Sequence, residues 1–295
     1  KMHSITANPK NGLVTNYVAK FIKDNAGKLW VSTYQGGLFR LEGDVQAIDS
    51  IRFKLATSEF ASEKVVAGAS ALWFSTDNDL FRLDIKTLEK KHVLNFNEPS
   101  HKRDIHCLFF SNNILWAGTE NGLLKYNPSK HSSEFCPIIT GRDVHIGNLT
   151  EDSRGNIWGA TNSFIFKYDP KARQSEMFPL DKDLPLKNFF YGCSAKSPLG
   201  KISFGGDNGY LTVDTEQPVP NTYQPKVYIT SLEINNQVVN TGEVVDDQIL
   251  LSNDMSFTPN LILDYAQRSL TFEFSSLHYW QPSMNVFAYK LEGFD

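Results

Sequence analysis

Short runs of alternating apolar and polar residues fill this chain of 295 residues, and turn-forming residues separate the runs. Such alternation predicts β-strands, because successive side chains of a strand point to opposite faces of a sheet. Helical periodicity is absent, apart from at most one turn near Asp181–Leu184. In the first part of the chain the pattern predicts strands near residues 17–24, 29–34, 37–42 and 51–56. The sequence therefore predicts an all-β protein.

A unit centred on tryptophan recurs along the first two thirds of the chain. The anchor positions are Trp30, Trp73, Trp116, Trp158 and, with the Trp lost, Ser203. They are spaced 43, 43, 42 and 45 residues apart, and a Thr follows each Trp after two residues. Four short antiparallel strands that recur every ~40–50 residues form one blade of a β-propeller, with the Trp packed between blades. Because a single blade cannot bury both of its faces, the five visible blades are expected to stack around a channel.

The propeller is predicted to occupy residues 1–216 and to be part of a larger ring. Met2–Thr6 resembles the outer strand of a blade. This strand either completes the fifth blade and closes a small ring, or it belongs to a preceding blade, and we expect the latter.

A second module is predicted after the repeat stops at Asp214. Residues 217–225 are rich in Pro and predict a linker. In residues 226–295, the apolar Leu270, Phe272 and Phe274 alternate with polar residues, as in a half-buried antiparallel strand. Four strand-like runs are too few for a complete sandwich of about seven strands. We therefore expect the N-terminal part of an Ig-like β-sandwich.

Composition and charge remove several classes of function. The net charge of −4 and the lack of a Lys/Arg-rich run argue against nucleic-acid binding. No apolar stretch approaches the ~20 residues that cross a bilayer, so a membrane would be reached only through segments outside this chain. The widely spaced Cys107, Cys136 and Cys193 are expected to be small buried strand residues rather than zinc ligands or disulfide partners. No metal or cofactor is predicted.

A candidate ligand surface is formed by the turn that follows the Thr position of each unit. In a closed propeller these turns ring one face around the central channel, and their amides and carboxylates, with one aromatic ring, suit the hydroxyl groups and flat face of a sugar. The same residue types are what tight hairpins require, so turn chemistry alone stays an alternative. The Trp residues themselves are expected in the core. The candidate residues are Tyr34, Gln35, Asp77, Asn78, Glu120, Asn121, Asn162, Asp207 and Asn208.

No catalytic residue is predicted. The seven histidines are scattered, with His101 and His106 the one close pair, and neither an HExxH nor a GxSxG motif occurs. A pair of carboxylates from different blades, as glycosidases use, is left open by the sequence.

Four stretches carry a resemblance to a known family. Asp152–Thr161 has the Asp, Gly, Trp and Thr of the regulator-propeller repeat, and Phe204–Gly209 reads FGGDNG. Leu263–Tyr279 and Tyr289–Asp295 follow the pattern of the three-tyrosine (Y_Y_Y) domain. With these motifs the chain resembles the periplasmic sensor region of hybrid two-component histidine kinases of gut Bacteroidetes. It departs from the repeat at Asp79 and Phe164, where glycine is usual.

The resemblance implies a function for the parent protein. Such a region senses a glycan or oligosaccharide and relays the signal across the inner membrane to control polysaccharide-utilisation genes. It implies a periplasmic location, a homodimeric full-length protein and no enzymatic activity in this chain, the kinase domain lying outside it. Two alternatives stay open: a secreted propeller enzyme (lyase or glycosidase) that acts on glycans, and a protein-docking scaffold.

Overall fold

The chain divides into two compact units, Lys1–Pro220 and Asn221–Asp295. The computed structural model describes residues 4–44, 46–58, 64–76, 79–95, 104–120, 122–138, 144–180, 186, 188–216, 226–276, 287–290 and 293. Within these residues the helical segments are two single turns, η1 (Ile48–Ser50) and η2 (Met255–Phe257). All other regular elements are strands, so the predicted all-β class is confirmed.

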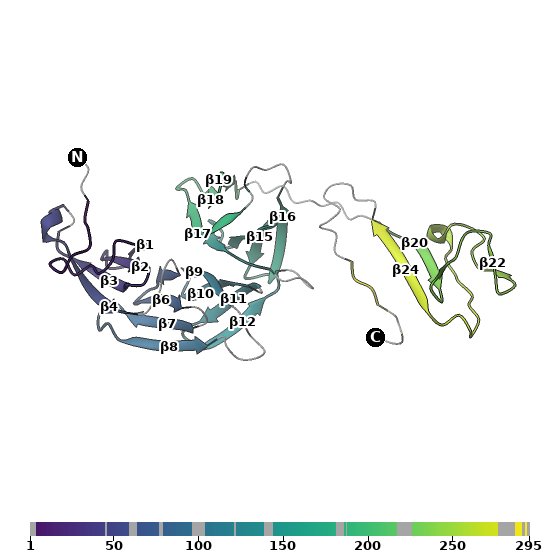
Figure 1. Ribbon diagram of the computed structural model, residues 1–295, viewed down its shortest axis with the longest axis horizontal. Coiled ribbons are helices and arrows are strands. Elements are labelled where there is room, and N and C mark those ends of the chain that lie inside the picture. The colour runs from purple at the N-terminus through teal and green to yellow at the C-terminus, as the bar shows by residue number, and fades with distance from the viewer. Residues whose placement is uncertain are drawn as a thin grey trace. The chain divides into compact units, whose positions relative to one another are not determined.

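The first unit contains five antiparallel sheets, each built from consecutive strands (Figure 1). Blade 1 comprises β1 (Val18–Lys23), β2 (Leu29–Thr33), β3 (Gly37–Glu42) and β4 (Arg52–Thr57). Blade 2 comprises β5 (Val65–Ala67), β6 (Ala71–Thr76), β7 (Asp79–Asp84) and β8 (Lys90–Asn95). Blade 3 comprises β9 (Ile105–Ser111), β10 (Ile114–Thr119), β11 (Gly122–Asn127) and β12 (Ser132–Cys136). Blade 4 comprises β13 (Asn148–Glu151), β14 (Ile157–Ala160), β15 (Phe164–Asp169) and β16 (Gln174–Pro179). Blade 5 comprises β17 (Phe189–Lys196), β18 (Ile202–Gly206) and β19 (Gly209–Val213).

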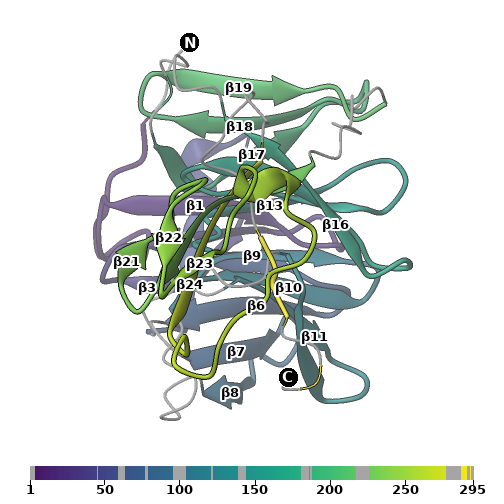
Figure 2. The same cartoon turned by 90° about the vertical axis from the view of Figure 1, so that its right-hand side faces the viewer.

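The blades stack through their first strands. β1 contacts β5, β5 contacts β9, β9 contacts β13 and β13 contacts β17. The five sheets therefore follow one another along an arc, the arrangement of a propeller (Figure 1). Figure 2 shows the order within the sheets, for example β17, β18 and β19 side by side in the fifth blade. The propeller fold predicted from the repeat is thus confirmed.

The repeated tryptophan is the main contact between neighbouring blades. Trp30 and Trp158 are fully buried, and each shares a hydrophobic cluster with residues of the following blade. The ring of Trp73 meets the edge of Tyr126 on the next blade, with ring centroids 5.8 Å apart. Trp116 meets Tyr168 in the same way at 6.0 Å. The prediction that these tryptophans are core residues is confirmed.

An aspartate six residues before the Trp fastens the first hairpin of blades 1 and 4. In blade 4 one carboxylate oxygen of Asp152 accepts the backbone N–H groups of Arg154 and Asn156, both at 2.9 Å. The other oxygen accepts the indole N–H of Trp158 at 2.9 Å. Asp24 makes the equivalent bonds to its own turn and to Trp30. The repeated Asp and Trp are therefore one structural device, because a buried indole N–H requires an acceptor.

A threonine after the Trp fixes the second hairpin of blades 1, 3 and 4. The buried hydroxyl groups of Thr33, Thr119 and Thr161 donate to the carbonyl oxygen of the first residue of the next strand, at 3.0, 2.8 and 2.9 Å. In blade 4 the same hydroxyl also accepts the N–H groups of Ser163 and Phe164. The Thr thereby sets the shape of the turn that carries the candidate ligand residues.

The N-terminal segment covers the face of blade 1 that points away from blade 2. Leu13 packs with Val31, Phe39 and Phe53 in a separate cluster. The backbone N–H of Phe53 donates to the carbonyl oxygen of Asn11 at 2.7 Å. The described residues Ser4–Thr6 are not in a strand, so the expected outer strand at Met2–Thr6 is not found there.

The second unit holds a three-stranded sheet in the order β21-β20-β24 and a separate hairpin. Its strands are β20 (Val227–Ile234), β21 (Gln237–Val238), β22 (Val244–Val245), β23 (Gln248–Ile249) and β24 (Leu270–Ser276). Leu232, Ile234, Val239, Leu250 and Leu251 form its core. The predicted alternation falls on β24, but Leu270, Phe272 and Phe274 are each about two-fifths exposed. The sandwich and its boundaries stay predictions.

The cysteines do not all behave as predicted. Cys107 and Cys136 are buried in blade 3, and burial raises the pKa of the Cys107 thiol to about 12. Cys193, in contrast, is exposed, so its assignment as a buried strand residue is wrong. It lies in the irregular part of β17, where the strand leaves the ladder and does not enter the core.

Replacement of Asp152 by Ala is expected to destabilise the first unit by about 1–3 kcal/mol, because the buried indole N–H of Trp158 loses its acceptor. For a domain of this size, about 2–4 °C of melting temperature accompany each kcal/mol. Thermal unfolding of D152A measures the loss, with the exposed Asp49→Ala as control. Equal melting temperatures for the two variants would contradict the role of the Asp–Trp contact.

Candidate functional site

The turns that follow the buried Thr positions lie at one face of the propeller. In blades 1 and 5 the first residue of the inner strand stands beside such a turn, since Val18 pairs with Thr33 and Phe189 pairs with Gly206. Blades 3 and 4 repeat this register. Because every blade has the same strand order, these ends share one face, which we name the turn face.

The described candidate residues occupy this face on four blades. Tyr34 and Gln35 are exposed on blade 1, with Gln35 at a φ of 63°. Asn162 is exposed on blade 4, and Asp207 and Asn208 are exposed on blade 5, whereas Glu120 of blade 3 is half-buried. Asp77, Asn78 and Asn121 lie outside the described residues. The role of these turns in binding a ligand stays a prediction.

Three rings from three different blades stack near this face. His106 of β9 lies 4.8 Å from Tyr191 of β17, with an angle of 18° between the ring planes. His106 also stacks with His145, which lies just before β13. Their ring centroids are 5.9 Å apart, and the angle between the ring planes is 14°. We name His106, His145 and Tyr191 the channel stack. It joins the inner edges of blades 3, 4 and 5.

An irregular segment of β17 brings Tyr191 to this position. Between the pairs Phe189–Gly206 and Ser194–Phe204, β17 advances five residues while β18 recedes two. The residues of β17 between Phe189 and Ser194 contact blade 4. There the side-chain amide of Asn148 donates a hydrogen bond to the carbonyl oxygen of Phe190 at 2.9 Å. The N–H of Gly192 donates to the carbonyl oxygen of Gly147, also at 2.9 Å.

Because Gly147 has no side chain, the ring of Tyr191 can lie directly against its backbone. A Cβ at Gly147 would lie 2.6 Å from Cδ1 of Tyr191, and every other atom near it belongs to the same ring. Real Cβ atoms do not approach that closely, so a side chain at position 147 would displace the tyrosine.

The channel stack combines open ring surface with polar groups. Tyr191 is 47% exposed and His145 is exposed, while Nε2 of His106 is buried without a hydrogen-bond partner. Burial lowers the pKa of His106, and Lys64 and His145 lower it further, against the opposing influence of Asp104 and Glu120. The lowered pKa favours the neutral form of His106 near pH 7.

Sequence patterns alone did not identify the channel stack. Neither His145 nor Tyr191 belongs to a sequence motif, and His106 stands out only as a neighbour of His101, which lies outside the described residues. One signal was present: the last repeat spacing is 45 residues rather than 42 or 43, and the excess falls in the blade that contains the β17 irregularity.

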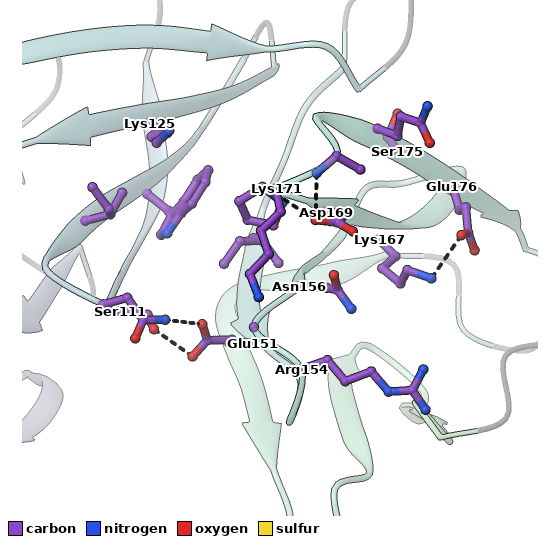
Figure 3. Close-up of a pocket in the computed structure, with 18 of the residues that line it drawn as sticks. Ser111, Lys125, Glu151, Arg154, Asn156, Lys167, Asp169, Lys171, Ser175 and Glu176 are labelled. Atoms are coloured by element: carbon purple, nitrogen blue, oxygen red, sulfur yellow. Dashed lines mark hydrogen bonds and ion pairs between the residues drawn. The ribbon is translucent and has the colours of Figure 1, made fainter.

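A groove of about 860 Å³ lies at the opposite ends of blades 3 and 4 (Figure 3). Its walls carry Ser111, Trp116, Lys125, Glu151, Arg154, Lys167, Lys171 and Glu176. Glu151 of blade 4 accepts hydrogen bonds from Ser111 and Asn112 of blade 3, at 2.6 and 2.9 Å. Lys167 pairs with Glu176 at 3.0 Å. The contacts of Glu151 join the two blades, and the Lys167–Glu176 pair joins β15 to β16 within blade 4, so these polar groups of the groove are engaged in the fold.

Among the residues that the structure describes, no three His, Cys, Asp or Glu side chains gather as metal ligands would. In the same residues, no helix has the length and apolar character needed to traverse a bilayer.

Comparison with known proteins gives matches in sequence and in fold. No family profile matches the chain. Over 92 residues it is 32% identical to Histidine kinase P4 of Formosa agariphila, a match that covers 31% of this chain and 6% of that protein. The extracellular domain of a B. thetaiotaomicron protein described as a hybrid two component system matches with a TM-score of 0.55 and 22% identity. That match covers 88% of this chain and 35% of the solved one.

A second solved structure is less similar. It is the extracellular domain of another B. thetaiotaomicron protein described as a hybrid two component system, with a TM-score of 0.45 and 20% identity. That match covers 78% of this chain and 39% of the solved one. The chain therefore spans well under half the length of these three proteins. The resemblance drawn from the repeats is confirmed as a likeness in fold, and over 92 residues in sequence, to proteins of this kind.

Protonation of His106 is expected to destabilise the first unit below about pH 6.5. Because its pKa is lowered in the folded state, the unfolded chain takes up the proton first, and stability rises with pH between the folded and unfolded values. His106→Phe keeps a flat ring but removes the titration, so its loss of melting temperature between pH 7 and 5 should be smaller than that of the unmodified chain. Parallel pH profiles would contradict this account.

Proposed function

We propose that this chain is part of the extracytoplasmic sensor region of a hybrid two-component system and that its ligand is a glycan. The observation that carries the proposal is the propeller itself, which matches the extracellular domain of such a protein over 88% of the chain. The 92-residue sequence match to a histidine kinase supports the same assignment.

The ligand class is supported by the chemistry of the turn face. Amides and carboxylates at Gln35, Asn162 and Asp207 can exchange hydrogen bonds with sugar hydroxyl groups. Tyr34 adds an aromatic ring that is 45% exposed. Polar groups arranged around aromatic surface are what orients a ligand of mixed polarity.

Signalling follows from a difference in affinity between conformations. A ligand that binds one arrangement of the parent protein more tightly shifts the population toward that arrangement, and the shift carries the signal. In this proposal the chain binds and the kinase outside it acts. The parent is a homodimer in the inner membrane, with this region in the periplasm and polysaccharide-utilisation genes as its output.

Thermal unfolding of the purified chain with xylohexaose, cellohexaose, arabinohexaose and tetragalacturonate tests the proposal. A ligand present at 100 times its dissociation constant stabilises the folded state by about 2.7 kcal/mol, which shifts the melting temperature by several degrees. We expect such a shift with one of these glycans, and chromatography of the same mixtures should show no cleavage.

Two outcomes would contradict the proposal. Cleavage products would identify a propeller enzyme that acts on glycans. No shift with any of the four glycans would favour a protein-docking scaffold.

A further inference from the structure

We propose that the channel stack, His106, His145 and Tyr191, binds a pyranose ring of a neutral glycan at the turn face. This inference rests on the proposed function and deepens it, because it assigns the site and the ligand chemistry. Nothing in the repeat pattern itself requires these three rings to meet.

The irregularity of β17 exceeds what the fold needs. The inner strands β1 and β9 each contain a small bulge, in which the strand advances two residues against one. β17 advances five residues against two, and the loss of ladder pairing is offset by bonds to Gly147 and Asn148 of blade 4. Bulges of this kind re-aim side chains and are enriched beside functional sites. Here the excursion places Tyr191 over blade 4 and against His106 of blade 3.

The rings are held in place but not covered. Tyr191 leaves 47% of its surface open although it stacks on His106, and Phe190 beside it is 56% exposed. An exposed, pre-oriented ring loses little conformational freedom on binding. The C–H face of a pyranose is apolar, so its contact with a flat aromatic ring removes apolar surface from water on both sides.

Polar groups border the rings. Asp104, Glu120 and Lys64 lie close enough to His106 to act on it electrostatically, the two carboxylates raising its pKa and the ammonium group lowering it. Asp207 and Asn188 bond to each other at 3.0 Å where β17 begins. Carboxylates accept hydrogen bonds from hydroxyl groups that surround a sugar ring. Since both signs of charge are present and carboxylates outnumber the ammonium group, a neutral sugar fits better than an anionic one.

Substitutions at two positions test the site in the complete chain. Tyr191→Ala removes the exposed ring, and Tyr191→Phe retains it. Gly147→Ala adds a methyl group whose close neighbours all belong to the ring of Tyr191, so it displaces the ring without removing it. Tyr210→Ala is the matched control, because Tyr210 is a 75% exposed tyrosine of the same blade, on β19.

Binding is measured by calorimetry with xylohexaose, cellohexaose, arabinohexaose and tetragalacturonate. We expect a neutral hexasaccharide to bind, Tyr191→Ala and Gly147→Ala to weaken it about tenfold or more, and Tyr191→Phe and Tyr210→Ala to leave it within about threefold. Unchanged affinity in both Tyr191→Ala and Gly147→Ala would overturn the site while leaving glycan sensing intact. Preference for tetragalacturonate would overturn the neutral class.

A separate measurement decides the case in which no oligosaccharide binds. That result would contradict the proposed function, and the channel stack is then tested by NMR with methyl β-glucopyranoside at high millimolar concentration. Shifts of the ring protons of His106 and Tyr191 that are absent in Gly147→Ala would support a pyranose site. Unshifted ring signals would overturn it.

Discussion

The contact of each tryptophan with the following blade is the constraint on which the structure depends. A four-stranded blade has two faces, and burying one of them on the next blade extends the propeller without further elements. The indole must also find an acceptor for its N–H group, which Asp24 and Asp152 supply in blades 1 and 4 while closing their hairpins. The stability of a blade and the shape of its first turn are therefore coupled through one carboxylate.

That coupling explains why the repeat was sufficient to predict most of the fold. The Asp, Trp and Thr positions each satisfy a local requirement, so the blades could be placed from the sequence, and the strand ends predicted for blade 1 differ from those observed by at most one residue. The exposure of Cys193 and the path of β17 could not be predicted in this way. Both depend on where blade 5 meets blades 3 and 4, which involves residues far apart in the sequence and not the period of the repeat.

The candidate site likewise has one part that follows from local sequence and one part that depends on contacts between blades. Turns on the face predicted to bind ligand follow from hairpin chemistry, and the structure places their described residues at one end of four blades. The channel stack arises only when three inner strands are brought together, with Gly147 making room and the Asn148 amide fixing the excursion. The groove at the other end of blades 3 and 4 has a volume of about 860 Å³, but its Glu151 is used to join the two blades and its Lys167 is paired with Glu176 inside blade 4.

The most direct test of the account is amide hydrogen exchange of the chain with and without a saturating neutral oligosaccharide. Ligand held by the channel stack should slow exchange in residues 104–106, 144–147 and 188–194, which come from blades 3, 4 and 5. Residues 111–114 and 154–157, which border the groove at the opposite ends of blades 3 and 4, should exchange as before. Protection confined to the groove segments, with none in β17, would contradict the assignment of the ligand site to the channel stack.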